Sequence, residues 1–133
     1  MSVYVTDTHA LVFFANRNRR KLSRLAWEVF EQAENRQAVI LIPAPALWEV
    51  SILEQTGNIK LTKPYSEWAR DLFRHPCYDC VPLDAEIIAQ ARNCNINHDI
   101  FDAAIIATAK VKDLPLITRD QAITDSGLVQ VLW

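Results

Sequence analysis

Short apolar runs alternate with segments of helical periodicity along this chain. Five runs predict strands: 3–6, 38–42, 80–83, 115–118 and 128–132. Six segments predict helices: 8–15, 24–34, 46–56, 65–74, 85–93 and 99–112. Because strands and helices alternate, we expect an α/β fold with a mostly parallel sheet of four or five strands and helices on both faces.

Residues of special conformation support several of these boundaries. Ser23 and Asp84 precede helical segments and are expected to cap them. Pro45 suits the first turn of the helix that follows the second strand, and Gly57 suits its end. Pro64 opens the next helical segment. A further short helix is expected after Asp120.

Composition favours one globular domain over residues 1–133. Half of the residues are apolar and 23% are charged, and there is no repeat or low-complexity tract. Gly57 and Gly127 are the only glycines, which excludes a flexible linker and a glycine-rich phosphate loop. The net charge of −2 excludes an overall basic field, so any nucleic-acid contact must come from a local patch.

The cysteines and the first residues indicate a reducing cytoplasm. Cys77 and Cys80 form a C-x-x-C pair, but a structural zinc site needs about two more ligands. Cys94 and His98 could supply them only by chance geometry, so we expect ordinary thiols. The chain runs from Met1 directly into a strand-like stretch, and no apolar run approaches the roughly 20 residues of a membrane helix. We therefore expect neither a signal peptide nor a membrane partner.

Acidic residues stand where strands or helix starts would deliver them to one edge of the sheet. Asp7 and Asp120 each follow a predicted strand, and Glu49 and Asp102 lie early in predicted helices. Asp99 precedes Asp102 by three residues, so both project from one helical face. Carboxylates only a few ångströms apart repel each other and strongly disfavour joint ionisation unless a cation is present. The pattern therefore indicates a divalent-metal site.

Taken singly, these acids have other interpretations. Asp7 and Asp120 are equally suited to cap the helices that follow them, and Asp99 can serve as a cap or a partner of the helix dipole. Glu49 has apolar neighbours on both sides, which favours a functional role. Asp102 stands in a segment with no other charge from 100 to 109. Burying an unpaired carboxylate costs several kcal/mol, so a metal or a hydrogen-bond partner must offset that cost.

Two sets of basic residues leave alternatives open. His9, beside Asp7, could be a base or a ligand, but its apolar neighbours predict a packed, hydrogen-bonded side chain. The one dense basic run comprises Arg17, Arg19, Arg20, Lys21 and Arg24. This run could contact RNA phosphates or acidic groups of a partner, or it could be a solvated loop and helix start.

Short motifs spread over essentially the whole chain resemble one family. In order, they read D-T-H-A-L, L-W-E-V, H-D-I-F-D-A-A-I-I-A-T-A, L-I-T-R-D and V-L-W. Their order and spacing resemble PIN-domain nucleases, and specifically the VapC-type toxins of type II toxin–antitoxin pairs. The resemblance implies a PIN-like α/β/α sandwich.

The resemblance also implies roles for particular residues. The catalytic acids fall on Asp7, Glu49, Asp102 and Asp120, and the metal ligands on Asp7, Asp99, Asp102 and Asp120. Thr118 matches the family's small hydroxyl residue near the last acid. Close relatives often read D-P-F-D-R, whereas this chain has Ile100 in place of the proline and Ala103 in place of the arginine. The missing arginine puts the pairing of Asp99 and some substrate contacts in doubt.

The function implied by the resemblance is a ribonuclease that depends on Mg²⁺ or Mn²⁺ and is inhibited by a cognate antitoxin. Hard divalent ions prefer such oxygen ligands, and they can activate water and steady a leaving oxygen. The products would carry a 5′-phosphate and a 3′-hydroxyl. Such toxins commonly form homodimers.

Four tryptophans stand out for a chain of this size: Trp27, Trp48, Trp68 and Trp133. An exposed subset of them could line a groove for an antitoxin helix.

Two other functions remain open. An aspartate-nucleophile phosphatase would use Asp7, but such enzymes require D-x-D, whereas the third position here is His9. A non-catalytic interaction module could keep the acidic edge only to bind a structural ion or a partner. A receiver-type signalling domain is less well supported, because the first strand ends in one acid rather than a pair.

Overall fold

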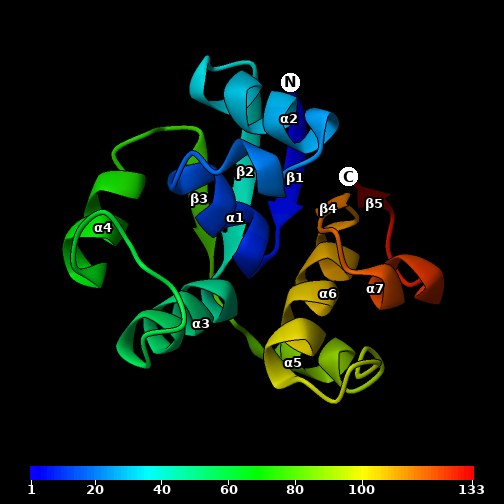
Figure 1. Cartoon of the computed structure of the whole chain (residues 1–133). Helices are drawn as coiled ribbons and strands as arrows, with labels where there is room; N and C mark the ends of the chain where they lie inside the picture. The colour runs from blue at the N-terminus through cyan, green and yellow to red at the C-terminus, as the bar shows by residue number, and fades with distance from the viewer.

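Five parallel strands form the centre of the molecule, in the order β3-β2-β1-β4-β5 (Figure 1). The computed structural model describes residues 1–133. The strands are β1 (Ser2–Thr6), β2 (Ala38–Pro43), β3 (Tyr78–Val81), β4 (Leu116–Ile117) and β5 (Val131–Leu132). The prediction of an α/β fold with a parallel sheet is confirmed.

Seven α-helices and one short 3₁₀ helix connect and flank the strands. They are α1 (Thr8–Ala15), η1 (Arg19–Lys21), α2 (Arg24–Glu34), α3 (Ala44–Gln55), α4 (Tyr65–Leu72), α5 (Ala85–Ala91), α6 (Ile100–Lys112) and α7 (Gln121–Ser126). Right-handed crossovers place α2, which packs on β2, and α6, which packs on β1 and β2, on opposite faces of the sheet. No helix has both the length and the apolar character that crossing a membrane requires.

Local side-chain chemistry explains most helix starts. The hydroxyl of Ser23 accepts a hydrogen bond from the N–H of Ala26, and Asp84 caps α5 through the N–H of Ile87. Both predicted caps are confirmed. Helix α3 begins two residues earlier than predicted, at Ala44, so that Pro45 lies within its first turn, where a missing N–H costs nothing.

Two strand predictions were misplaced. The strand expected at 80–83 lies at Tyr78–Val81, because Pro82 has no N–H to offer a neighbouring strand. The strand expected at 128–132 is confined to Val131–Leu132. In both cases the apolar pattern was present but extended beyond the residues that pair.

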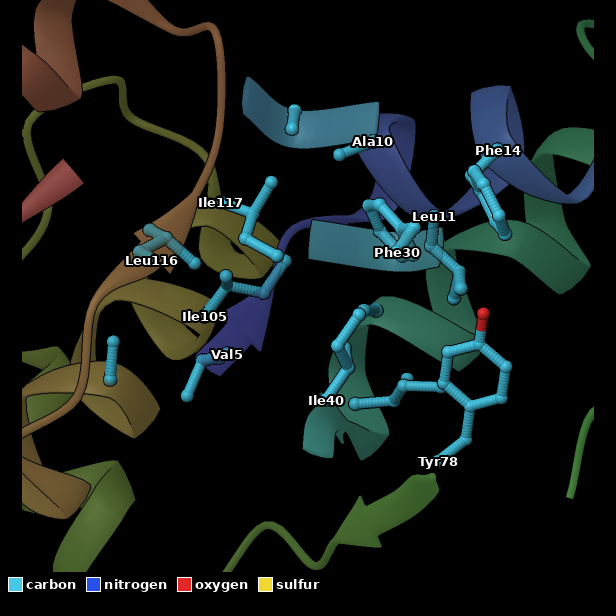
Figure 2. Close-up of a cluster of buried hydrophobic side chains, with 14 of the residues drawn as sticks. Val5, Ala10, Leu11, Phe14, Phe30, Ile40, Tyr78, Ile105, Leu116 and Ile117 are labelled. Carbon is cyan, nitrogen blue, oxygen red and sulfur yellow. The ribbon is translucent and has the colours of Figure 1, made fainter. Parts of the chain in front are cut away.

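One continuous apolar core joins the sheet to the helices. Phe14 of α1 stacks on Phe30 of α2, with ring centroids 4.7 Å apart. Figure 2 shows these rings with Leu11 on one side of the buried cluster and the strand residue Val5 on the other side. On α6, every residue from Ala103 to Ala109 is buried, as expected for a small, apolar helix packed closely against its neighbours.

The strand order determines where a ligand site can form. The chain moves from β1 through β2 to β3 and then crosses back to β4 on the other side of β1. In open parallel sheets, ligands bind at the carboxyl ends of the strands beside such a reversal. Asp7 directly follows β1, and Asp120 comes three residues after β4, so both lie at this edge.

Candidate active site

The five acids predicted from the sequence line one open cavity of about 400 Å³ at this edge of the sheet. They come from four separate parts of the chain and are Asp7, Glu49, Asp99, Asp102 and Asp120. His9, Arg119 and Gln121 complete the lining, which contains no apolar residue. The fold therefore gathers carboxylates that are up to 113 positions apart in the sequence.

Three of these acids cap helices, so the predicted capping roles of Asp7, Asp99 and Asp120 are confirmed. Oδ1 of Asp7 accepts from the N–H of Ala10 at 2.9 Å, and Oδ1 of Asp120 accepts from the N–H of Ile123 at 3.0 Å. Oδ1 of Asp99 accepts from the first turn of α6 at 2.8 and 3.2 Å. Capping uses Oδ1 of each residue, so it fixes the side chains without excluding a role for Oδ2 in the cavity.

Glu49 is held by a buried hydroxyl on another helix. The side chain of Thr8 is 1% exposed, and its Oγ1 donates to Oε1 of Glu49. This hydrogen bond links α1 to α3 and keeps Glu49 directed to the cavity. Thr8 belongs to the D-T-H-A-L motif, but nothing in the sequence indicated that it would contact a residue 41 positions away.

An amide group connects two of the carboxylates. Nδ2 of Asn97 donates to Oδ2 of Asp102 at 3.1 Å and to Oδ2 of Asp120 at 3.2 Å. Asn97 lies in the polar loop before α6, and nothing in its local sequence distinguishes it from the neighbouring asparagines. Its contact with the two acids was therefore not predicted.

Burial raises the proton affinity of the site. Desolvation raises the pKa of Asp7 from 3.8 to about 6, although the Thr118 side chain and the Ala10 N–H oppose the shift. Burial likewise raises the pKa of Glu49 and of Asp102, against the hydrogen bonds from Thr8 and Asn97. None of the ion pairs in the structure includes any of the five acids. The acids of the site therefore have no cationic side chain within ion-pair distance, although His9 and Arg119 line the same cavity.

The donor set fits a hard divalent cation. Mg²⁺ and Mn²⁺ prefer carboxylate oxygens, and all of the anionic groups in the cavity are carboxylates. No group of three or more His, Cys, Asp or Glu side chains converges closely enough to hold an ion in the present arrangement. Binding an ion at this site therefore requires some of these side chains to move closer together.

The prediction for His9 was wrong. Its side chain is exposed and lines the cavity, because the second position of α1 faces the edge of the sheet rather than the core. Arg119, which belongs to the L-I-T-R-D motif, places its guanidinium over the Phe13 ring, 5.0 Å from the ring centroid. His9 lies near the same ring, with a centroid separation of 6.1 Å. These two residues are the basic groups of the cavity.

The basic run lies away from the acids. It follows the last residue of α1, whereas Asp7 precedes the first, so eight helical residues, about 12 Å, separate the two ends. Arg17 pairs with Glu34 at 3.0 Å, and the guanidinium of Arg19 lies 5.0 Å from the Trp27 ring centroid. Contacts to RNA by this run remain a prediction.

The tryptophans divide between the core and the surface. Trp27 and Trp68 are buried, Trp133 is half-buried, and Trp48 is 57% exposed. Trp48 makes an edge-on contact with the Phe101 ring, and both residues line an apolar hollow formed with α5. The three cysteines are free, as expected, and only Cys80 is exposed.

Comparison with known proteins gives a consistent picture. The sequence profile of the family described as "PIN domain" matches residues 4–126. No curated protein matches the chain. Among solved structures, the chain is similar to VapBC2 from Rickettsia felis bound to a DNA fragment from its promoter, with a TM-score of 0.69 and 13% identity over 98% of this chain and 97% of that chain.

Two further structures have a similar fold. FitAcB from Neisseria gonorrhoeae has a TM-score of 0.64 and 19% identity, covering 98% of this chain and 96% of that chain. VapBC-5 from Mycobacterium tuberculosis, described as a member of the VapBC family of toxin–antitoxin systems, has a TM-score of 0.60 and 16% identity, covering 99% and 98%. At these identities the similarity establishes the fold.

Proposed function

The chain belongs to the PIN domain family, and from this we propose that it is a metal-dependent endoribonuclease that acts as the toxin of a toxin–antitoxin pair. The observation that carries the proposal is the cavity with five carboxylates and no paired cation. Structural neighbours that are toxin–antitoxin complexes support the second half of the proposal, which includes a cognate antitoxin.

Asp7, Asp99, Asp102 and Asp120 are the residues that would hold Mg²⁺ or Mn²⁺. When bound, the ion supplies a more acidic water and neutralises negative charge at the phosphate under attack. Glu49, fixed by the hydrogen bond from Thr8, would orient the attacking water through its carboxylate. His9 and Arg119 are the groups of the cavity that can contact the RNA phosphates, and no histidine is needed as a general base.

The proposal predicts RNA cleavage by the purified protein with Mg²⁺ or Mn²⁺, and none after EDTA removes the metal. End-labelled RNA resolved on a gel measures the cleavage, and digestion by an exonuclease that requires a 5′-phosphate identifies the product ends. Uptake of Mn²⁺ without turnover on any RNA would instead support the non-catalytic module. A covalent aspartyl-phosphate on Asp7 would support the phosphatase.

An apolar surface beside the cavity supports the homodimer. It is formed by α3, α5 and α6, and its exposed side chains are Trp48 (57%), Leu83 (40%), Ile88 (52%) and Ile100 (72%). No charged residue lines it, which is typical of obligate interfaces rather than of transient ones. We assign it to a second copy of this chain, because pairing there would bring two acidic cavities to one shared groove.

A charge in this surface is expected to separate the protomers. Ile88→Asp places a carboxylate in the apolar interface, where burial without a partner costs several kcal/mol. Ala89→Asp is the matched control, since Ala89 is exposed on the same helix but does not line the surface. Sedimentation should give a dimer for the wild type and A89D and a monomer for I88D. A dimeric I88D would show that the interface lies elsewhere.

A further inference from the structure

The Asn97 side chain occupies a central position between two acids that come from different parts of the fold. Its Nδ2 lies 3.1 Å from Oδ2 of Asp102, on α6, and 3.2 Å from Oδ2 of Asp120, the cap of α7. The bridge therefore spans 23 residues of sequence and connects the two helix starts that face the cavity. Asn97 is half-buried, so its amide is partly screened from water.

The local backbone brings Asn97 and Asp99 to the same cavity. His98, between them, has a φ of 52°, a left-handed conformation that is uncommon for residues other than glycine. The turn at His98 leaves its own side chain exposed while Asp99 caps α6 and Asn97 reaches the two carboxylates. The turn therefore directs Asn97 to the two carboxylates, His98 to solvent and Asp99 to the first turn of α6.

An amide is well suited to this position. Its two N–H groups can serve two acceptors, and it carries no charge to compete with a cation. Each carboxylate oxygen has two lone pairs, so it can accept from Asn97 and still coordinate an ion. Hydrogen bonds of this kind to ligating carboxylates typically change metal affinity by about 10- to 100-fold.

We propose that Asn97 is a positioning residue that holds Asp102 and Asp120 close together, against their mutual repulsion, for divalent-metal binding. The inference rests on the proposed function for the identity of the metal ligands. Asn97 does not itself bind the ion. Without its amide, the two carboxylates separate, and part of the free energy of metal binding is spent on bringing them together again.

Calorimetric titration of the metal-free full chain with Mn²⁺ tests this inference. Asn97→Leu keeps the approximate shape of the side chain and removes both donors, and Asn97→Ala is a second variant in case the leucine disturbs the loop. Asn95→Leu is the matched control, since Asn95 is exposed in the same loop. We expect the Mn²⁺ Kd to rise about 10- to 100-fold in N97L and N97A and to stay within about twofold in N95L.

Several outcomes would overturn the inference. A Kd within twofold of the wild type in both Asn97 variants, with only the urea midpoint lowered, would show a merely structural role. Tighter binding would show that the amide competes with the metal, and absence of Mn²⁺ binding by the wild type would remove the site itself. RNA cleavage is measured separately. If Mn²⁺ binding depends on Asn97 but no RNA is cleaved, the proposed function fails and the role of Asn97 stands.

Discussion

Asp102→Asn is expected to reduce RNA cleavage by at least about 1,000-fold while leaving the fold intact. The substitution removes the negative charge of a proposed metal ligand that lines the acidic cavity. Metal-ion catalysis contributes several kcal/mol, and each 1.36 kcal/mol corresponds to tenfold in rate. The measurement is the initial rate of cleavage of an end-labelled RNA at saturating Mn²⁺.

The fold should tolerate this change, because burial already disfavours the charged form of Asp102 and raises its pKa. The asparagine can still accept the hydrogen bond from Asn97 through its amide oxygen. Asp79→Asn is the matched control and should keep full activity, because Asp79 is an exposed residue of β3 that does not line the cavity. Growth arrest on expression should be lost with D102N and kept with D79N. Undiminished cleavage by D102N would contradict the proposed site.

The sequence predicted the elements best where two local signals coincide. Helices α1 and α2 have the predicted bounds, because periodic apolar residues follow directly on a capping side chain, Asp7 or Ser23. Where an apolar run had no such boundary, as before β5, the strand was placed too long. Hydrophobicity indicates burial, but pairing in a sheet depends on neighbours that local sequence does not show.

The acids of the site could be predicted because parallel strands all deliver their carboxyl ends to one edge. The residues that hold the acids could not, because Thr8 and Asn97 act across 41 and 23 residues through tertiary contacts. His9 was assigned to the core from its apolar neighbours, whereas the rotation of α1 turns it to the cavity. A residue early in a helix at a sheet edge can thus be exposed among apolar neighbours.

The same residues show why stability and function oppose each other at this site. Asp7 caps α1, and asparagine caps helices as well as aspartate does. The carboxylate is therefore not required by the fold, and in the charged form it is disfavoured by burial. An acid that costs stability and has a neutral equivalent for its structural role is best explained by what its charge does in the cavity.

The metal-free protein is expected to lose stability as the pH rises from about 4 to about 6. The pKa of Asp7 is about 6 in the folded chain and close to 3.8 when unfolded, so the folded state binds more protons in this interval. The contribution is fully present below the unfolded pKa and is lost as the pH rises through the folded one. At 1.36 kcal/mol per unit of pKa, the loss is about 2 to 3 kcal/mol. The raised pKa values of Glu49 and Asp102 act in the same direction.

Urea unfolding of the wild type and Asp7→Asn at pH 4 and pH 7.5, in EDTA, isolates the contribution of Asp7. Because the asparagine does not titrate, D7N should be close to the wild type at pH 4 and about 2 kcal/mol more stable at pH 7.5. Asp84→Asn is the matched control, since Asp84 caps α5 in the same way but is exposed. This variant should not show the gain of about 2 kcal/mol at pH 7.5 that is expected for D7N. Equal stability of D7N and the wild type at pH 7.5 would mean that the Asp7 carboxylate ionises without penalty in the metal-free fold.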